Sequence, residues 1–220
     1  MKVLGLTGSI AMGKSTVAKM LKRQGIPVHD SDATVHRLMA PGGDAFKGIA
    51  EVFPSVIVDG HIDRQTLGRI VFGQPDKLKI LESISHPLVA RETRRFLARQ
   101  QARGRGLVVL DIPLLFETGA EKRCDFIACV SAPAFIQTQR ALARPGMTLE
   151  KFLSIKAQQT ADQEKRQKSD FILHSGLGLA LTENQVKQML MKILVRPKSR
   201  PCAWPPNSFN NPAFKGSIYA

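Results

Sequence analysis

An eight-residue segment near the start of the chain has the residue types that bind phosphate groups. It runs from Gly8 to Ser15 with the sequence GSIAMGKS and fits the pattern G-x-x-x-x-G-K-S without a gap. The two glycines allow backbone angles that a side chain would disfavour, so successive amide N–H groups can turn toward one phosphate. The lysine of this pattern reaches the β- and γ-phosphates of a nucleotide, and its serine hydroxyl is placed to ligate Mg²⁺. We therefore predict ATP-binding contacts from Gly8, Ala11, Met12, Gly13, Lys14, Ser15 and Thr16, with Lys14 also catalytic and Ser15 also a metal ligand.

The elements on either side of this segment match what the pattern requires. Lys2–Thr7 is short, apolar and β-prone, which predicts a buried strand. Lys14–Gln24 has apolar residues at helical spacing and ends before Gly25, which predicts a helix with a glycine stop. A chance glycine-rich turn is the alternative, but the strand-to-helix context favours the phosphate loop. The pattern G-x-G-x-x-G is absent from this segment, which excludes a dinucleotide-binding fold.

Acidic residues follow two further apolar runs. Ile26–Val28 leads into Asp30 and Asp32, and a second predicted strand ends at Asp111. The carboxyl ends of parallel strands face the ligand crevice of such a sheet, and phosphoryl transfer to an alcohol needs an oriented carboxylate or base. We therefore predict Asp32 as the base and an acceptor contact, and Asp111 as a second metal ligand. The alternative is that Asp30 and Asp32 are turn and cap residues before a helix over Ala33–Leu38.

Basic residues are concentrated in the last third of the predicted core. Seven cations and three acids lie between Arg140 and Lys168. Arg140 and Arg144 are four residues apart and so share one helical face. This pattern predicts a lid that closes over ATP, with Arg140 as a catalytic cation and Arg144 as an ATP contact. The alternative is a solvated charged face.

Short apolar strands alternate with helices along the chain. This order predicts an α/β fold in which a five-stranded parallel sheet is flanked by helices. Strands are predicted over 2–7, 26–28, 107–110, 126–130 and 171–173. Helices are predicted over 14–24, 33–38, 44–53, 63–72, 75–84, 88–103, 135–143, 149–159 and 182–195, with N-caps at Asp44, Asp63 and Thr182.

Composition limits the partners and the location of the protein. The 220 residues include 32 Lys and Arg against 18 Asp and Glu, a net charge of +14 that implies an anionic partner. No apolar run reaches the roughly 18 residues needed to span a membrane. The start of the chain lacks the pattern of a signal peptide, so we expect a cytoplasmic protein. Residues 196–220 contain five prolines and no acid, which predicts a flexible tail.

Missing motifs narrow the class of nucleotide-binding protein. The chain has no D-x-x-G or N-K-x-D, which a GTPase needs, and no L-S-G-G-Q, which a transporter ATPase needs. A small kinase remains the favoured class. A P-loop nucleic-acid-binding protein is the alternative from another class, but the scarcity of aromatic residues disfavours it.

Taken together, the motifs resemble the dephospho-coenzyme A kinase family. The matching segments are LTGSI with GKS, HDSD at 29–32, DGHIDR at 59–64, HPLV at 86–89, PLLFE at 113–117, Arg140 with Arg144, Gln159, and Asp170. The resemblance covers about residues 1–194. One departure is Ala11, which stands where the family usually has glycine.

The resemblance implies transfer of the ATP γ-phosphate to the ribose 3′-hydroxyl of dephospho-coenzyme A, with Mg²⁺ as cofactor. It implies a kinase domain over residues 1–195 with a helical substrate-binding insertion at 39–104 and a lid at 144–168. Lys14 would stabilise the phosphates, Asp32 would be the base and Arg140 the lid arginine. The expected acceptor contacts are Asp32, Arg64, His86 and Leu114. A kinase that acts on a nucleoside or a sugar remains the alternative within this class. No membrane partner is expected, and nucleic acid is disfavoured as a partner.

Overall fold

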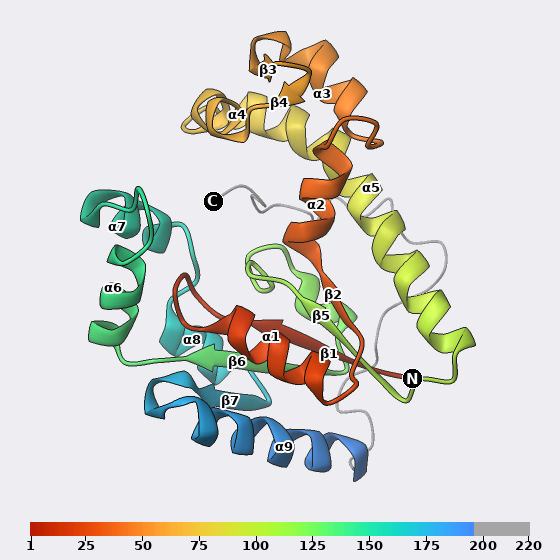
Figure 1. The fold of residues 1–220 in the computed structure, drawn as a ribbon, viewed down its shortest axis with the longest axis vertical. Coiled ribbons are helices and arrows are strands. Elements are labelled where there is room, and N and C mark those ends of the chain that lie inside the picture. Colours follow the sequence, from red (N-terminus) through yellow and green to blue (C-terminus); the bar gives the residue numbers. More distant parts are fainter. Residues whose placement is uncertain (196–220) are drawn as a thin grey trace.

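The computed structural model describes residues 1–195, and the predicted tail at 196–220 lies outside the described residues. Its centre is a five-stranded sheet in the order β2-β5-β1-β6-β7 (Figure 1). Every neighbouring pair of strands is parallel. The strands are β1 (Lys2–Thr7), β2 (Val28–Asp30), β5 (Leu107–Asp111), β6 (Phe126–Ser131) and β7 (Phe171–His174). The predicted α/β class with five parallel strands is confirmed.

The central strands read as continuous apolar runs because helices cover both faces of the sheet. All residues of β5 and β6 are buried, as are all but the first of β1. One face packs on α1 (Lys14–Arg23) and α9 (Leu179–Val195), which lie side by side. The opposite face packs on the C-terminal part of α5 (Pro75–Ala102) and on the segment 115–124.

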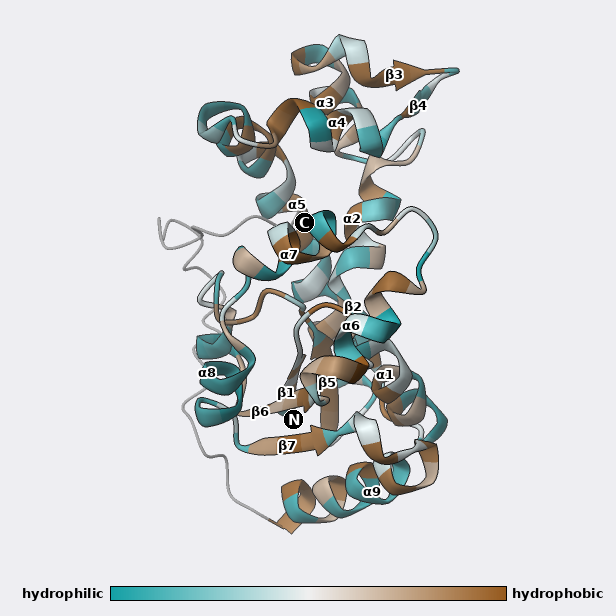
Figure 2. Ribbon diagram, turned by 90° about the vertical axis from the view of Figure 1, so that its left-hand side faces the viewer, coloured by the Kyte–Doolittle hydropathy of each residue, from teal (hydrophilic) through white to brown (hydrophobic). Residues whose placement is uncertain are grey.

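A helical unit stands beyond the end of β2 and has a core of its own (Figure 2). It contains α2 (Ser31–Met39), α3 (Phe46–Val52), α4 (Arg64–Val71) and the N-terminal part of α5. A two-stranded hairpin of β3 (Ile57–Val58) and β4 (His61–Ile62) also belongs to it. The sequence analysis missed this hairpin, although the Asp59–Gly60 pair between its strands is a typical hairpin turn.

Three helices complete the described chain on the side of β6 and β7. They are α6 (Ala134–Leu142), α7 (Leu149–Ala157) and α8 (Asp162–Gln167). Helix α6 contacts α7, whereas α8 packs on β6. In Figure 1 the pair α6–α7 projects away from the sheet, on the same side as the helical unit.

Helix α5 corrects the prediction of two helices at 75–84 and 88–103. It runs without a break from Pro75 to Ala102 and contains Pro87. Proline lacks the N–H that would continue the helical ladder, so its position predicted a boundary. The helix continues because side chains on both sides of the proline are buried, including Leu81 and Ser85 before it and Ala90 and Thr93 after it.

One of the three predicted N-caps is confirmed and two are wrong. The Asp63 carboxylate accepts a hydrogen bond from the Gln65 amide at 3.0 Å and caps α4. Asp44 instead forms an ion pair with Arg91, and α3 begins at Phe46. Thr182 lies inside α9, where its hydroxyl bonds carbonyl oxygens of preceding residues.

The packing of β1 predicts a cost for a methyl group at Gly5. A Cβ atom there would lie 2.7 Å from the Cys124 Sγ and 3.3 Å from a Leu115 methyl carbon. We expect Gly5→Ala to lower the free energy of unfolding by about 1–3 kcal/mol, measured by urea denaturation. The control Gly68→Ala, in a helix with open space around the new methyl, should raise it by about 0.5–1 kcal/mol. Equal effects of the two variants would contradict this packing argument.

Candidate active site

The segment that matches the phosphate pattern connects β1 to α1 at the carboxyl end of the sheet. Gly13 is the N-cap residue of α1, with φ 88°, and no side chain caps the helix. The left-handed conformation favours glycine at this position, and a Cβ would also press on the Ser175 side chain. The first amides of α1 are therefore left for a ligand, and the helix dipole favours an anion.

A cleft of about 450 Å³ opens over this loop. Every predicted ATP contact lines it, together with the predicted catalytic residues Asp32 and Arg140. Further lining comes from α7, from the segment after it, and from the start of α9. The complete lining consists of residues 8–16, Asp32, Pro113, Arg140, Arg144, Ile155, Gln159, Ser175, Leu179 and Thr182.

Lys14 and Asp111 form an ion pair at the edge of the cleft. Asp111 is buried at the end of β5, and burial raises the pKa of its carboxyl group, an effect that the Lys14 charge opposes. The predicted phosphate-binding lysine and the predicted metal ligand are therefore direct neighbours. In this state, the lysine charge balances a carboxylate that burial would otherwise penalise.

The two acids after β2 have different roles in the structure. The Asp30 carboxylate accepts a hydrogen bond from the Ala33 amide at 2.9 Å and is the N-cap of α2. The cap interpretation is thus correct for Asp30, whereas Asp32 faces the cleft. Burial is the main cause of the raised pKa of Asp32; the nearby Lys14 charge opposes it, and Asp30 and Asp111 add to it. A carboxylate with a raised pKa in a cleft is suited to act as a general base.

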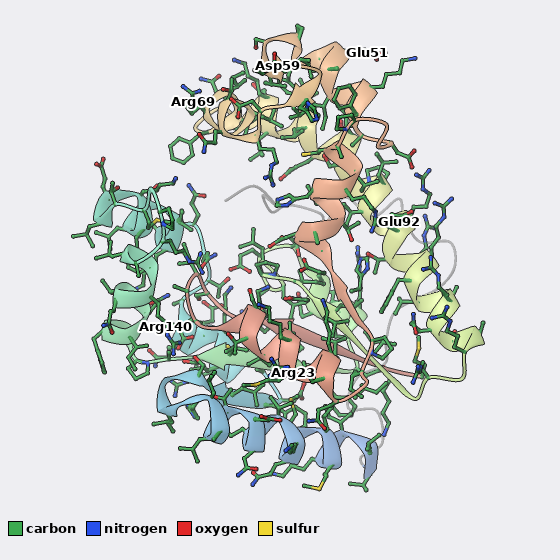
Figure 3. All side chains as sticks on the ribbon, viewed as in Figure 1. Arg23, Glu51, Asp59, Arg69, Glu92 and Arg140 are labelled. Atoms are coloured by element: carbon green, nitrogen blue, oxygen red, sulfur yellow. The ribbon has the colours of Figure 1, made fainter. Side chains whose placement is uncertain are left out.

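Ser175 holds both the loop and the predicted catalytic arginine, and the sequence analysis did not identify it as a site residue. The guanidinium of Arg140 donates to the Ser175 hydroxyl at 3.0 Å and to its carbonyl oxygen at 2.9 Å. The same hydroxyl donates to the Met12 carbonyl oxygen at 2.6 Å. Arg140, in the last turn of α6, therefore has its guanidinium beside the phosphate loop (Figure 3). A serine in a short turn has no motif that would predict this contact.

Two glutamines fix the middle of the loop. The Ile10 amide donates to the Gln159 side-chain oxygen at 2.9 Å, and the Gln137 side-chain amide donates to the Ile10 carbonyl at 2.9 Å. An apolar contact lies beside them, where Ala11 packs with Ala141 and Phe152. Ala11 has φ 61°, so it adopts the left-handed conformation that glycine adopts at lower cost. Its methyl group contacts Phe152 of α7, and this contact is formed despite the unfavourable backbone conformation.

Three predicted acceptor contacts lie outside the lining of the cleft. Arg64 is exposed at the start of α4, and its charge lowers the pKa of His36, although burial is the larger cause. His86 lies within α5, where burial lowers its pKa to about 4. Leu114 is 9 % exposed, next to Pro113, which does line the cleft.

Comparisons with known proteins agree on one family. The family model described as dephospho-CoA kinase matches residues 2–180. A dephospho-CoA kinase of Paramagnetospirillum magneticum is 58 % identical over 166 residues, which are 76 % of this chain and 78 % of the relative. One of Mesorhizobium japonicum is 51 % identical over 190 residues, covering 86 % of this chain and 95 % of the relative.

Solved structures give the same picture at the level of the fold. A crystal structure from Thermus thermophilus has a TM-score of 0.80 at 35 % identity and covers 89 % of this chain and 98 % of its own. A dephospho-CoA kinase from Campylobacter jejuni has a TM-score of 0.58 at 22 % identity, covering 87 % of this chain and 97 % of its own, which supports the fold. Within residues 1–195, none of the helices combines the length and apolar character that crossing a membrane requires.

The histidine before Asp30 predicts how stability depends on pH. The His29 Nε2 lies 3.1 Å from the Thr93 hydroxyl, which donates to the Val89 carbonyl and so accepts a hydrogen bond from the imidazole. Burial, with a smaller contribution from Arg37, lowers the pKa of His29 to about 4. Its contribution to stability is therefore complete above about pH 6.5 and is lost as the pH falls toward 4.

Between pH 7 and pH 4.5, we expect the free energy of unfolding to fall by about 2–3 kcal/mol less in His29→Gln than in the wild type. Urea denaturation at several pH values measures this difference. Gln can still donate a hydrogen bond to Thr93 but does not titrate, so the comparison isolates the imidazole charge. A variant whose pH dependence equals that of the wild type would refute the assignment.

Proposed function

Because the chain belongs to the dephospho-CoA kinase family, we propose how the residues of its cleft carry out the family's reaction. The activity is transfer of the ATP γ-phosphate to the ribose 3′-hydroxyl of dephospho-CoA, the final step of coenzyme A biosynthesis. The observation that carries the mechanism is the single cleft in which the phosphate loop, Asp32 and Arg140 meet.

The loop and α1 would hold the phosphates of ATP. No side chain caps the start of α1, whose first residues line the cleft, and the helix dipole adds a favourable field for the anion. Lys14 is already at the loop, so a small movement of its ammonium from Asp111 would bring it to the β- and γ-phosphates. Arg144 lines the cleft from the segment between α6 and α7 and would contact ATP from that side.

Asp32 would act on the acceptor hydroxyl. Its carboxylate would accept the proton of the 3′-hydroxyl as the oxygen attacks the γ-phosphorus, and the bond from that phosphorus to the β-phosphate oxygen would break. The raised pKa of Asp32 makes this proton transfer easier than it would be for a fully solvated aspartate. Arg140 would stabilise the charge on the transferring phosphoryl group, and the Ser175 contacts already orient its guanidinium.

The donor atoms at the cleft fit Mg²⁺. The Ser15 hydroxyl lines the cleft, the Asp111 carboxylate is beside Lys14, and ATP would supply phosphate oxygens. Magnesium prefers such oxygen ligands and usually keeps several waters, so a dense cluster of acids is not needed. We propose Ser15 and Asp111 as the residues that hold it. Bound there, the ion would neutralise part of the phosphate charge.

The helical unit would hold the acceptor. The separate core of this unit is built from α2, α3, α4 and the N-terminal part of α5, while the C-terminal part of α5 packs on the sheet. Asp32 lies in the first turn of α2, where the unit joins the sheet. Arg64 is exposed at the start of α4 in the same unit and is available to a phosphorylated ligand. We place His86 and Leu114 in positioning roles beside the acceptor site, since neither lines the cleft.

The lid is narrower in this proposal than the predicted range 144–168. Helix α7 projects from the sheet and lines the cleft through Ile155. Helix α8 packs on β6, and Lys165 within it is fully buried. We therefore assign the moving part to residues 144–157, which end where α7 ends and the segment leading to α8 begins. ATP and dephospho-CoA are both polyanions, which accounts for the excess of basic over acidic residues in the kinase domain. Coenzyme A synthesis is consistent with a cytoplasmic location.

An ADP-release assay with dephospho-CoA as acceptor tests the activity and the role of Asp32. We expect Asp32→Asn to lower kcat by about 10²–10⁴-fold, because the amide cannot accept the proton, while the Kd of ATP stays within about threefold.

Asp30→Asn is the matched control for that variant. Asparagine caps helices as well as aspartate does, so α2 keeps its start and kcat should stay within about threefold of the wild type. Full activity of Asp32→Asn would remove Asp32 from the mechanism. An equal loss in both variants would show that charge in this segment, rather than one base, is required.

A further inference from the structure

The turn 112–117 after β5 connects the acceptor side of the cleft to the interior. Pro113 and Asp32 both line the cleft, and they lie two residues after Asp111 and Asp30, which are paired at the ends of the neighbouring strands β5 and β2. Its carbonyl oxygen accepts hydrogen bonds from the Thr7 hydroxyl at 3.0 Å and from the Lys165 ammonium at 3.3 Å. Thr7 is the last residue of β1, and Lys165 belongs to α8. The position of this turn is therefore set by groups from two elements beneath the cleft.

Glu117, at the end of the same turn, neutralises the buried lysine. Its Oε1 lies 2.8 Å from the Lys165 ammonium, whose side chain is 0 % exposed, while that of Glu117 is 12 % exposed. A buried ion pair of this kind costs desolvation energy, and a well-packed apolar pair would stabilise a fold as well or better. Charge neutralisation alone thus gives no stability advantage over an apolar pair at these two positions.

The same Glu117 oxygen also holds the return segment of the lid. It accepts a hydrogen bond from the Thr160 amide at 2.7 Å. The preceding residue, Gln159, accepts the Ile10 amide of the phosphate loop at 2.9 Å and lines the cleft. Residues 158–161 connect α7 to α8. One short segment is therefore tied to the phosphate loop by Gln159 and to the acceptor-side turn by Glu117.

We propose that Glu117 is a positioning residue for the phosphoryl transfer, because it fixes the return segment 158–161 of the lid against the acceptor-side turn 112–117. The assignment of these two sides rests on the proposed function. Glu117 does not line the cleft, so it acts through Thr160 and Pro113 rather than on a substrate. Its loss would misplace the lid relative to the acceptor, and small misplacements of this kind reduce the rate strongly.

ATP binding alone depends on Glu117 much less. The loop keeps two other anchors, the Gln137 side chain on the Ile10 carbonyl and the Ser175 hydroxyl on the Met12 carbonyl. Lys14 and the start of α1 are not in contact with Glu117 through any of these bonds. Loss of the Glu117 contact should therefore change kcat and the KM for dephospho-CoA, whereas the Kd of ATP should stay the same.

Two double variants separate this role from charge compensation. Glu117→Leu with Lys165→Met removes the buried charges and also removes the acceptor for the Thr160 amide. Glu117→Gln with Lys165→Met removes the same charges but keeps an oxygen at the position of Oε1. We expect the leucine pair to lose about tenfold or more in kcat/KM for dephospho-CoA, with the Kd of ATP within about threefold. The glutamine pair should stay within about threefold of the wild type in both.

Equal activity of the two pairs would overturn the proposal, since the Thr160 contact would then have no effect. Amide hydrogen exchange at Thr160 gives a second measurement that needs no substrate. Exchange should be slow in the wild type and the glutamine pair and fast in the leucine pair. Fast exchange in the wild type would also overturn the proposal. If the wild type fails to phosphorylate dephospho-CoA, the proposed function is wrong, and the exchange data alone decide whether Glu117 fixes the segment.

Discussion

The parallel pairing of β2, β5 and β1 brings three strand ends to one edge of the sheet. In this register Asp30 lies opposite Asp111, and Asp111 lies opposite Leu6, one residue before the end of β1. The phosphate loop, the buried carboxylate and the acidic segment of α2 therefore converge although they are far apart in the sequence. A shift of β5 by one residue would turn Asp111 to the other face of the sheet. The cleft lies at this edge. The proposed acceptor unit and the proposed lid follow β2 and β6, whose ends lie at the same edge.

This convergence has an electrostatic cost that the site itself offsets. Burial is the largest cause of the raised pKa of both Asp32 and Asp111. The charge of Asp30 adds to the shift at both residues, and the charge of Asp111 adds to it at Asp32. Lys14 opposes the shift at both residues. The Lys14 ammonium, which would bind phosphate, thus stabilises the buried carboxylates when no ligand is bound. A phosphate group that binds would compete with Asp111 for this ammonium. Phosphate affinity and the stability of the free site are linked through one side chain.

Polar contacts to the backbone, rather than a continuous core, join the phosphate loop to the elements around it. Gln137, Gln159 and Ser175 each bond a main-chain group between Ile10 and Met12. A small apolar cluster lies beside these bonds and contains Ile10, Ala11, Ala141, Met147 and Phe152. Directional bonds define positions without the tight packing that would resist movement. In the proposed lid, such an arrangement would let residues 144–157 move while Gln159 stays bonded to the loop. The left-handed backbone of Ala11 shows that the contact is kept despite a conformational cost.

Short-range patterns in the sequence determined the phosphate loop, the five strands of the sheet and the family, because each depends on residue types within a few positions of one another. The predicted ATP contacts proved to share one cleft for the same reason, since all but Arg144 belong to a single turn and helix start. The sequence already predicted Asp32 as the site residue, but only the tertiary structure separated the two acids, with Asp30 as the cap of α2 and Asp32 at the cleft. It also kept α5 continuous through Pro87, by burying residues on both sides of the proline. Ser175, Glu117 and Lys165 acquired their roles in the same way, through partners that lie 43 to 163 residues away. A local pattern cannot specify such pairs, because they exist only after the strands have aligned.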